Sequence, residues 1–298
     1  MRKTLVFILC LGLFGCQQVP IDSEGTRTSN ISFNVIQVEQ TPISRTALSE
    51  VCTGLNYYRY TNGKLTNSLV QTSSDQGFGE FSDEMPWGTH ELYFIGHKSE
   101  VTNFANSVAT FDKMNDTFTH YQTFTVDGDT PKSQNFKLDR RVAKFELLVT
   151  DALPDWLGSV YFKITGGTKK INVKTGVGEA AMVQEKTIQI PAKDLGASEK
   201  KFSSFVFLPQ GVDCIDVEVI AYDQEGEEQT SYLFEDVEMA VNYITRYKGK
   251  LFGKDAGFKL SVKAEWTDIN EHTFYKAKAD THHGRRLSFR FTTLYYIN

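Results

Sequence analysis

The sequence predicts an all-β protein with two β-sandwich or barrel domains in tandem. Short runs that alternate apolar and polar residues recur along most of the chain, and turn-forming residues separate them. Phenylalanine and tyrosine, which favour strands, number 22 and 13 among the 298 residues. No long segment has the apolar repeat of an amphipathic helix. Successive strands without intervening helices are typical of sandwiches and barrels.

The first sixteen residues have the pattern of a bacterial lipoprotein signal. A basic start, Met1-Arg2-Lys3, precedes an apolar run over 4–14 that is too short to span a bilayer. Leu13-Phe14-Gly15-Cys16 closes the run and resembles the lipobox, in which the cysteine thiol is diacylated and becomes the new N-terminus. We therefore expect a signal peptide over 1–15, and acyl chains such as palmitate on Cys16 would give stable membrane attachment. An uncleaved membrane anchor is the alternative.

The segment that follows is expected to be a lipid-anchored tether over 16–30, because it is polar and lacks periodicity. Residues 31–137 are expected to form the N-terminal sandwich. Residues 31–38 alternate with one slip, which indicates a half-buried strand, and Asn62-Gly63 is a strong hairpin signal after a strand over 46–60. The further strands expected here are 64–71, 77–81, 89–97, 104–111 and 118–126.

Residues 138–266 are expected to form the C-terminal sandwich, with a hairpin tip at 223–229. Its expected strands are 138–149, 160–165, 169–173, 187–190, 202–208, 214–222, 230–234, 242–252 and 258–266. Residues 267–298 form a C-terminal extension of mixed composition. Within it, 287–297 is either a terminal strand or a poorly folded segment.

Charge and cysteine content exclude several classes of protein. The chain has 32 basic and 37 acidic residues, a net charge of −5, which disfavours nucleic acid as a partner. Of the four cysteines, Cys10 leaves with the signal and Cys16 is lipidated. Cys52 and Cys214 remain, and we expect buried free thiols rather than a bridge between the two domains.

No catalytic motif is present, so we predict that the protein is not an enzyme and needs no cofactor. The esterase elbow, the phosphate-binding glycine loops and the His-Glu-x-x-His zinc motif are all missing. His90 and His97 fall on opposite faces of one strand, which disfavours a shared metal, and we expect solvated histidines. The acidic groups Asp83-Glu84, Asp127/Asp129 and Glu225/Glu227-Glu228 are expected to lie in solvated turns.

Trp87 is a candidate platform for stacking on a sugar ring, because it sits in the turn Pro86-Trp87-Gly88. The alternative is a buried anchor of the loop.

Several motifs occur in an order that resembles the fimbrillin-like proteins of Bacteroidota, and most of all their fimbrial anchor and minor subunit lipoproteins. The resemblance covers residues 31–266. After the lipobox it rests on Phe33 and Val35, 44–47, 60–63, 74–79, 86–88, 92–99, 138–145, 242–245, 249–252 and Trp266.

This resemblance implies two transthyretin-like (Greek-key) β-sandwich domains and a lipid-anchored fimbrial (pilus) subunit or anchor at the outer membrane. Assembly with other fimbrial subunits would proceed by β-strand addition, and host or bacterial surface ligands are possible partners in adhesion. Shaft subunits of such a family are cut after an arginine, for which Arg27 and Arg45 are the candidates here. A cut at Arg45 would remove strand 31–38 and expose a sheet edge. The alternative for Arg45 is a plain loop residue.

A surface lipoprotein that binds glycans through exposed aromatics is the second function that the sequence allows, with Trp87 as the contact residue.

Overall fold

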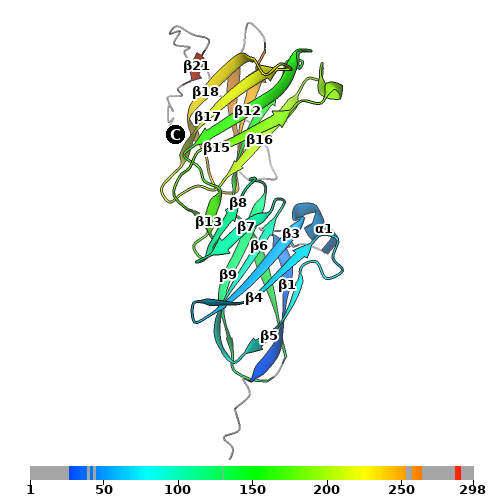
Figure 1. The fold of residues 1–298 in the computed structure, drawn as a ribbon, viewed down its shortest axis with the longest axis vertical. Coiled ribbons are helices and arrows are strands. Elements are labelled where there is room, and N and C mark those ends of the chain that lie inside the picture. Colours follow the sequence, from blue (N-terminus) through cyan, green and yellow to red (C-terminus); the bar gives the residue numbers. More distant parts are fainter. Residues whose placement is uncertain are drawn as a thin grey trace, which may run out of the picture.

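The computed structural model describes residues 27–38, 41–42, 45–129, 131–252, 257–263 and 286–289. The chain is nearly all β, as predicted, and Figure 1 shows two groups of strands that follow one another along the long axis. Cys16, the signal peptide and most of the C-terminal extension lie outside the described residues. No helix in the described part of the chain combines the length and apolar character needed to span a bilayer.

The N-terminal group is an eight-stranded sheet in the order β2-β1-β10-β9-β6-β3-β4, with β5 paired to β1. Its strands are β1 (Thr28–Val38), β2 (Thr41–Pro42), β3 (Gly54–Thr61), β4 (Lys64–Thr72), β5 (Glu80–Pro86), β6 (Gly88–His97), β9 (Thr117–Val126) and β10 (Lys132–Arg140). One short helix, α1 (Arg45–Val51), joins the group through Leu48, which is buried in the same core. This core contains alternate side chains of the strands, among them Phe33, Tyr57 and Phe94.

The C-terminal group is a sandwich of two sheets. One contains β16 (Lys200–Val206), β11 (Ala143–Val149), β19 (Ile244–Lys250) and β20 (Gly257–Lys263), in that order. The other contains β15 (Gln184–Gln189), β12 (Leu157–Thr165), β17 (Cys214–Asp223), β18 (Glu228–Glu238) and β21 (Arg286–Phe289), and a single 3-10 turn, η1 (Ala192–Asp194), follows β15. Phe145, Phe162 and Phe234 lie in the core between the sheets.

A fourth sheet joins the two groups. The hairpin β7 (Val101–Ala105) and β8 (Val108–Phe111) pairs with β13 (Lys170–Asn172) and β14 (Val177–Gly178), so strands from both halves share one ladder. A separate cluster of buried side chains lies beneath it, including Tyr93, Phe111 and Phe207. The division at 137/138 remains a proposal: Leu138 still belongs to the N-terminal core, β10 runs across the division to Arg140, and the joining sheet crosses it as well.

Two of the predicted local features are present in detail. The slip in the first strand is a β-bulge between Val35 and Gln37, which leaves Ile36 46% exposed and returns Val38 to the core. The hairpin at Asn62-Gly63 has φ angles of 51° and 73°. Both angles lie in the left-handed region that a type I′ turn requires and that glycine adopts without strain.

Other boundaries differ from the expectation. The segment 46–51 was expected to extend the following strand but belongs to helix α1. The strand predicted over 104–111 is the hairpin β7–β8, which turns at Asn106 and Ser107 with φ of 51° and 67°. The first strand begins at Thr28 rather than Ile31, so it takes up the end of the predicted tether.

Both cysteines in the described residues are free thiols, as predicted. Cys52 is fully buried, and burial raises its pKa to about 12, so its reactive thiolate form is disfavoured. Cys214 is only partly buried, contrary to the expectation of a buried thiol.

Candidate functional site

Strand β1 lies between β10 and β5 and pairs with both of them. It pairs in parallel with β10 over 31–38 and antiparallel with β5 over 28–34. Within the described residues β1 is the sole strand partner of β5, and β10 pairs otherwise only with β9, at Asp139 and Arg140. Loss of β1 would therefore leave open backbone edges on both flanking strands.

The inward side chains of β1 fill the core. Ile31 and Phe33 are fully buried, and the Phe33 ring lies 5.5–6.0 Å from the rings of Tyr57, Phe94 and Phe124. Burying a side chain of this size stabilises a protein by about 1.5–3 kcal/mol. Removal of β1 would therefore create apolar pockets between two unpaired edges, and a strand with matching alternation could refill them.

A buried polar cluster holds β5 in place independently of β1. The Asp83 carboxylate on β5 accepts hydrogen bonds from Tyr57 Oη at 2.7 Å, Arg59 Nη1 at 3.0 Å and Asn67 Nδ2 at 2.8 Å. These partners belong to β3 and β4, so β5 is tied to the opposite part of the sheet. The expectation of a solvated turn at Asp83 was wrong, because its side chain is only 2% exposed.

The two candidate processing residues flank β1. Arg27 precedes the strand, so a cut after it would leave β1 attached, whereas Arg45 follows both β1 and β2. Arg45 is the first residue of α1, so the bond after it lies in the first helical turn. Proteolysis there requires that turn to unwind, because proteases bind an extended chain.

Trp87, the candidate sugar platform, lies in the turn between β5 and β6 and is 37% exposed. The Arg27 guanidinium carbon is 4.9 Å from the centroid of its ring, and the Trp87 backbone N–H donates to the Arg27 carbonyl at 2.9 Å. This cation–π contact occupies one face of the indole, so a sugar would have to stack on the other or displace the arginine.

His90 and His97 are buried rather than solvated, which corrects the expectation. His90 is fully buried; its Nε2 lies 2.7 Å from the Pro86 carbonyl and its Nδ1 lies 2.7 Å from the Thr61 hydroxyl. His97 is 6% exposed, and its Nε2 lies 2.7 Å from Asn56 Oδ1. Burial lowers the pKa of His97, which favours the neutral ring. No group of three or more potential metal ligands occurs in the described part of the chain.

Glu84 is exposed but lies on strand β5 rather than in a turn, whereas the acidic candidates near 127–129 and 225–227 lie at turns, as expected. Asp127 is exposed and pairs with Lys132 at 2.6 Å. The tip of the β17–β18 hairpin is organised by Asp223, whose carboxylate accepts the backbone N–H groups of Glu225 and Glu227. These residues build turns and do not converge on a common point.

The protein is therefore an all-β protein of packed sheets in which strand β1 covers the edges of both β5 and β10. The chain belongs to a family of unknown function (DUF6562), whose model matches residues 85–282. A comparison with curated proteins finds no match.

The chain is similar to solved structures of fimbrial proteins. The fimbrial anchor protein Mfa2 from Porphyromonas gingivalis matches with a TM-score of 0.45 and 9% identity, over 79% of this chain and 97% of that one. The C-terminally truncated tip fimbrial protein Mfa3 of the same organism gives 0.40 and 10%, over 80% and 100%. A fimbrial assembly protein from Parabacteroides distasonis gives 0.44 and 12%, over 83% and 99%.

Proposed function

We propose that this protein is a lipid-anchored fimbrial subunit or anchor at the outer membrane, which assembles with other subunits by β-strand addition and supports adhesion without catalysis. The observation that carries the proposal is the position of β1 between β10 and β5, with Ile31 and Phe33 inserted in the core. The lipobox ending at Cys16 and the ordered fimbrillin-like motifs support it from the sequence.

Two fates of the chain follow from this geometry. With β1 in place both flanking edges are paired, and the acyl chains on Cys16 hold the protein as an anchor. After a cut at Arg45, β1 is free to leave, while the Asp83 cluster still binds β5 to β3 and β4. The vacated groove would then accept a strand from a neighbouring subunit through main-chain hydrogen bonds and alternate side chains.

The N-terminus of the protein in the fibre fraction distinguishes the two fates. Mass spectrometry of an acylated Cys16 supports an anchor, whereas a start at Thr46 supports a processed subunit. Cys16→Ala should release the protein from the membrane, and Cys10→Ala is the matched control because Cys10 lies in the apolar run of the signal. Retention of the Cys16→Ala protein in the membrane would contradict the lipid anchor.

Processing and strand exchange are tested with single variants. Arg45→Ala should abolish the Thr46 start, while Arg27→Ala should not. The purified chain beginning at Thr46 should bind a synthetic peptide of residues 28–38 and lose that binding when the peptide carries Phe33→Asp, since a carboxylate cannot enter the apolar pocket. Equal binding of both peptides would contradict a groove that recognises the Phe33 side chain.

Glycan binding through Trp87 is the second candidate, favoured by the partial exposure of the indole. Affinity electrophoresis on a panel of polysaccharides tests it. If a polysaccharide retards the protein in the gel and Trp87→Ala abolishes this retardation, glycans bind at Trp87. If Trp87→Ala leaves the retardation of the protein unchanged, the candidate is removed.

A further inference from the structure

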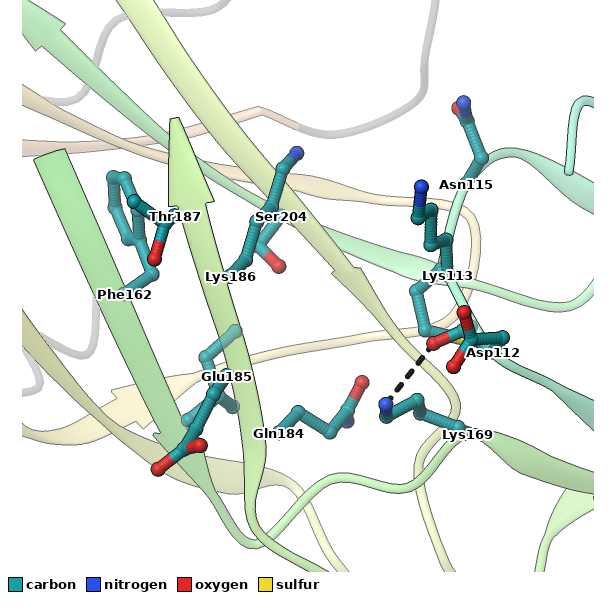
Figure 2. A pocket seen from close by; sticks show the side chains of 12 residues that line it. Asp112, Lys113, Asn115, Phe162, Lys169, Gln184, Glu185, Lys186, Thr187 and Ser204 are labelled. Carbon is teal, nitrogen blue, oxygen red and sulfur yellow. Dashed lines mark hydrogen bonds between the residues drawn. The ribbon is translucent and has the colours of Figure 1, made fainter. Parts of the chain in front are cut away.

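A cavity of about 430 Å³ opens at one side of the C-terminal sandwich, where it meets the N-terminal half (Figure 2). Its sides are β15 and β16, each of which ends its own sheet, and its floor is the inward face of β12. Residues 112–115, which connect β8 to β9, contribute the remaining wall. The volume lies within the range of roughly 300–1,000 Å³ found for small-molecule sites, which often lie between structural units.

Polar side chains occupy inward positions around this cavity. On β15 the inward series runs through Gln184, Lys186 and Ile188, and only the last packs against the sandwich core. On β16 Ser204 stands between the core residues Phe202 and Val206. Polar residues at core positions reduce stability unless they are satisfied, so their gathering at one opening indicates a role other than packing.

One of these groups is buried and lacks a hydrogen-bond partner among the described residues, and a second is also buried. Gln184 is 5% exposed, and its Nε2 makes no hydrogen bond. A half-turn of its carboxamide would present the N–H groups to the cavity and break no hydrogen bond made by Nε2. Ser204 is 6% exposed, and its hydroxyl borders the same space.

The charged groups at the cavity favour an anion. The ammonium of Lys169 donates to the Asp112 carbonyl at 3.0 Å, and that of Lys186 donates to the Ser203 carbonyl at 2.9 Å. Neither these lysines nor Lys113 pairs with a carboxylate in the described part of the chain, so each ammonium retains donors for a ligand.

Two carboxylates also line the cavity and oppose this charge only in part. Glu185 is engaged by the Tyr161 hydroxyl at 2.7 Å, and Asp112 is exposed beside Lys113. Three ammonium groups and two carboxylates therefore line the cavity, a net charge of +1 (3 − 2) that leaves it weakly electropositive.

The floor of the cavity is apolar, since Phe162 and Ile164 of β12 belong to the sandwich core. A ligand that fits must therefore combine a carboxylate for the lysines, hydroxyls for Ser204 and Gln184, and a face of C–H groups for the floor. We propose that this cavity binds an acidic sugar of the uronic-acid class. The site is separate from strand β1 and the strands β5 and β10 that pair with it, and it does not depend on strand exchange.

Titration calorimetry of the full chain with D-glucuronate, and with D-glucose as the neutral analogue, tests this proposal. Saturable binding of glucuronate is expected, with no detectable binding of glucose. Lys186→Met keeps the side-chain stem but removes the charge, and should weaken binding by about tenfold or more, the equivalent of one charge-assisted hydrogen bond. Gln184→Leu and Ser204→Ala should each weaken it as well.

Lys201→Met is the matched control, since Lys201 lies on β16 at an outward, exposed position outside the cavity. It makes the same change of charge and should leave binding unchanged. Thermal unfolding of each variant separates lost binding from lost folding, and Lys186→Met should fold normally because Lys186 is exposed. The proposal is overturned if glucuronate does not bind, if Lys201→Met weakens binding as much as Lys186→Met, or if acetate and sulfate displace glucuronate at equal concentration.

Discussion

Asp83 shows how one residue can hold a strand against the rest of its sheet. Its carboxylate is 2% exposed and its ion-pair partner, Arg59, is 8% exposed, so both charges are withdrawn from water. Burial, together with the negative charge of Asp83, raises the pKa of Tyr57, which keeps that phenol a hydrogen-bond donor. The three donors on β3 and β4 compensate the cost of burying the carboxylate.

Asp83→Ala should lower the free energy of unfolding by about 3–5 kcal/mol, because it leaves the Arg59 charge buried without its partner. Urea denaturation followed by tryptophan fluorescence measures the change. Asp129→Ala, in an exposed loop, should change stability by less than about 0.5 kcal/mol. Equal effects of the two variants would show that the cluster is not stabilising.

Glu146 gives the C-terminal sandwich a dependence on pH. Burial alone would raise the pKa of its carboxyl, but Lys144 at 2.8 Å and Arg246 at 2.5 Å outweigh burial and lower the pKa below its usual value. A lowered carboxyl pKa stabilises the folded state above the unfolded pKa of about 4.3, and this contribution is lost as the pH falls through the folded pKa.

Glu146→Gln should therefore destabilise the protein by about 1–3 kcal/mol at pH 7. The difference from the unsubstituted protein should shrink as the pH is lowered from 5 towards 3, a range taken from the direction of the shift. Urea denaturation at several pH values measures it, with the exposed Glu225→Gln as the control. A difference that is constant with pH would contradict the ionic role.

At the scale of elements, β1 is the strand whose contribution is easiest to isolate. Phe33→Ala should cost about 3–5 kcal/mol, because it opens a cavity among three aromatic rings. Ile36→Ala should cost less than about 1 kcal/mol, because Ile36 lies at the bulge and is 46% exposed. Chemical denaturation compares the two, and a comparable loss for both would mean that β1 is not anchored through its inward face.

The strands could be predicted from the sequence wherever both the alternation and the turn chemistry are local. Residues 31–38 and the Asn62-Gly63 hairpin are of this kind. The segment before β3 is ambiguous, since Leu48 fits a two-residue repeat with its neighbours but forms a helical face with Val51 and Cys52. The backbone N–H of Cys52 donates to the Leu48 carbonyl, which continues the helical pattern.

Features that depend on distant partners could not be read from local sequence. Asp83 occupies an inward position of β5, so a charged residue broke the apolar alternation and hid the strand. Its compensating partner Arg59 lies on another strand, and only the fold brings the two together. The cavity could not be predicted either: the strand expected over 187–190 left out Gln184 and Lys186, and the lysine at 169 and the loop at 112–115 join them only through tertiary structure.

At the scale of the whole molecule, the two halves share a sheet, a cluster of side chains and several polar links. β8 pairs with β13 at Ala109 and Ile171, and Arg140, the last residue of β10, binds both Asp116 and Asn242. Contacts of this kind couple the unfolding of neighbouring units. We therefore expect the described strands of both halves to unfold together.

Phe207 is the residue through which this coupling is best tested. It is fully buried in the cluster between the halves, and its ring lies 5.5 Å from that of Phe111 on β8. Phe207→Ala should destabilise the protein by about 3–5 kcal/mol. It should also divide the calorimetric unfolding into two resolved transitions, because each large core remains intact while the contact between them is weakened.

The control is Val70→Ala on strand β4, where Val70 is 67% exposed. This variant should leave a single transition near its original temperature. A single undivided transition in Phe207→Ala, shifted no further than in Val70→Ala, would show that the shared cluster does not couple the two halves.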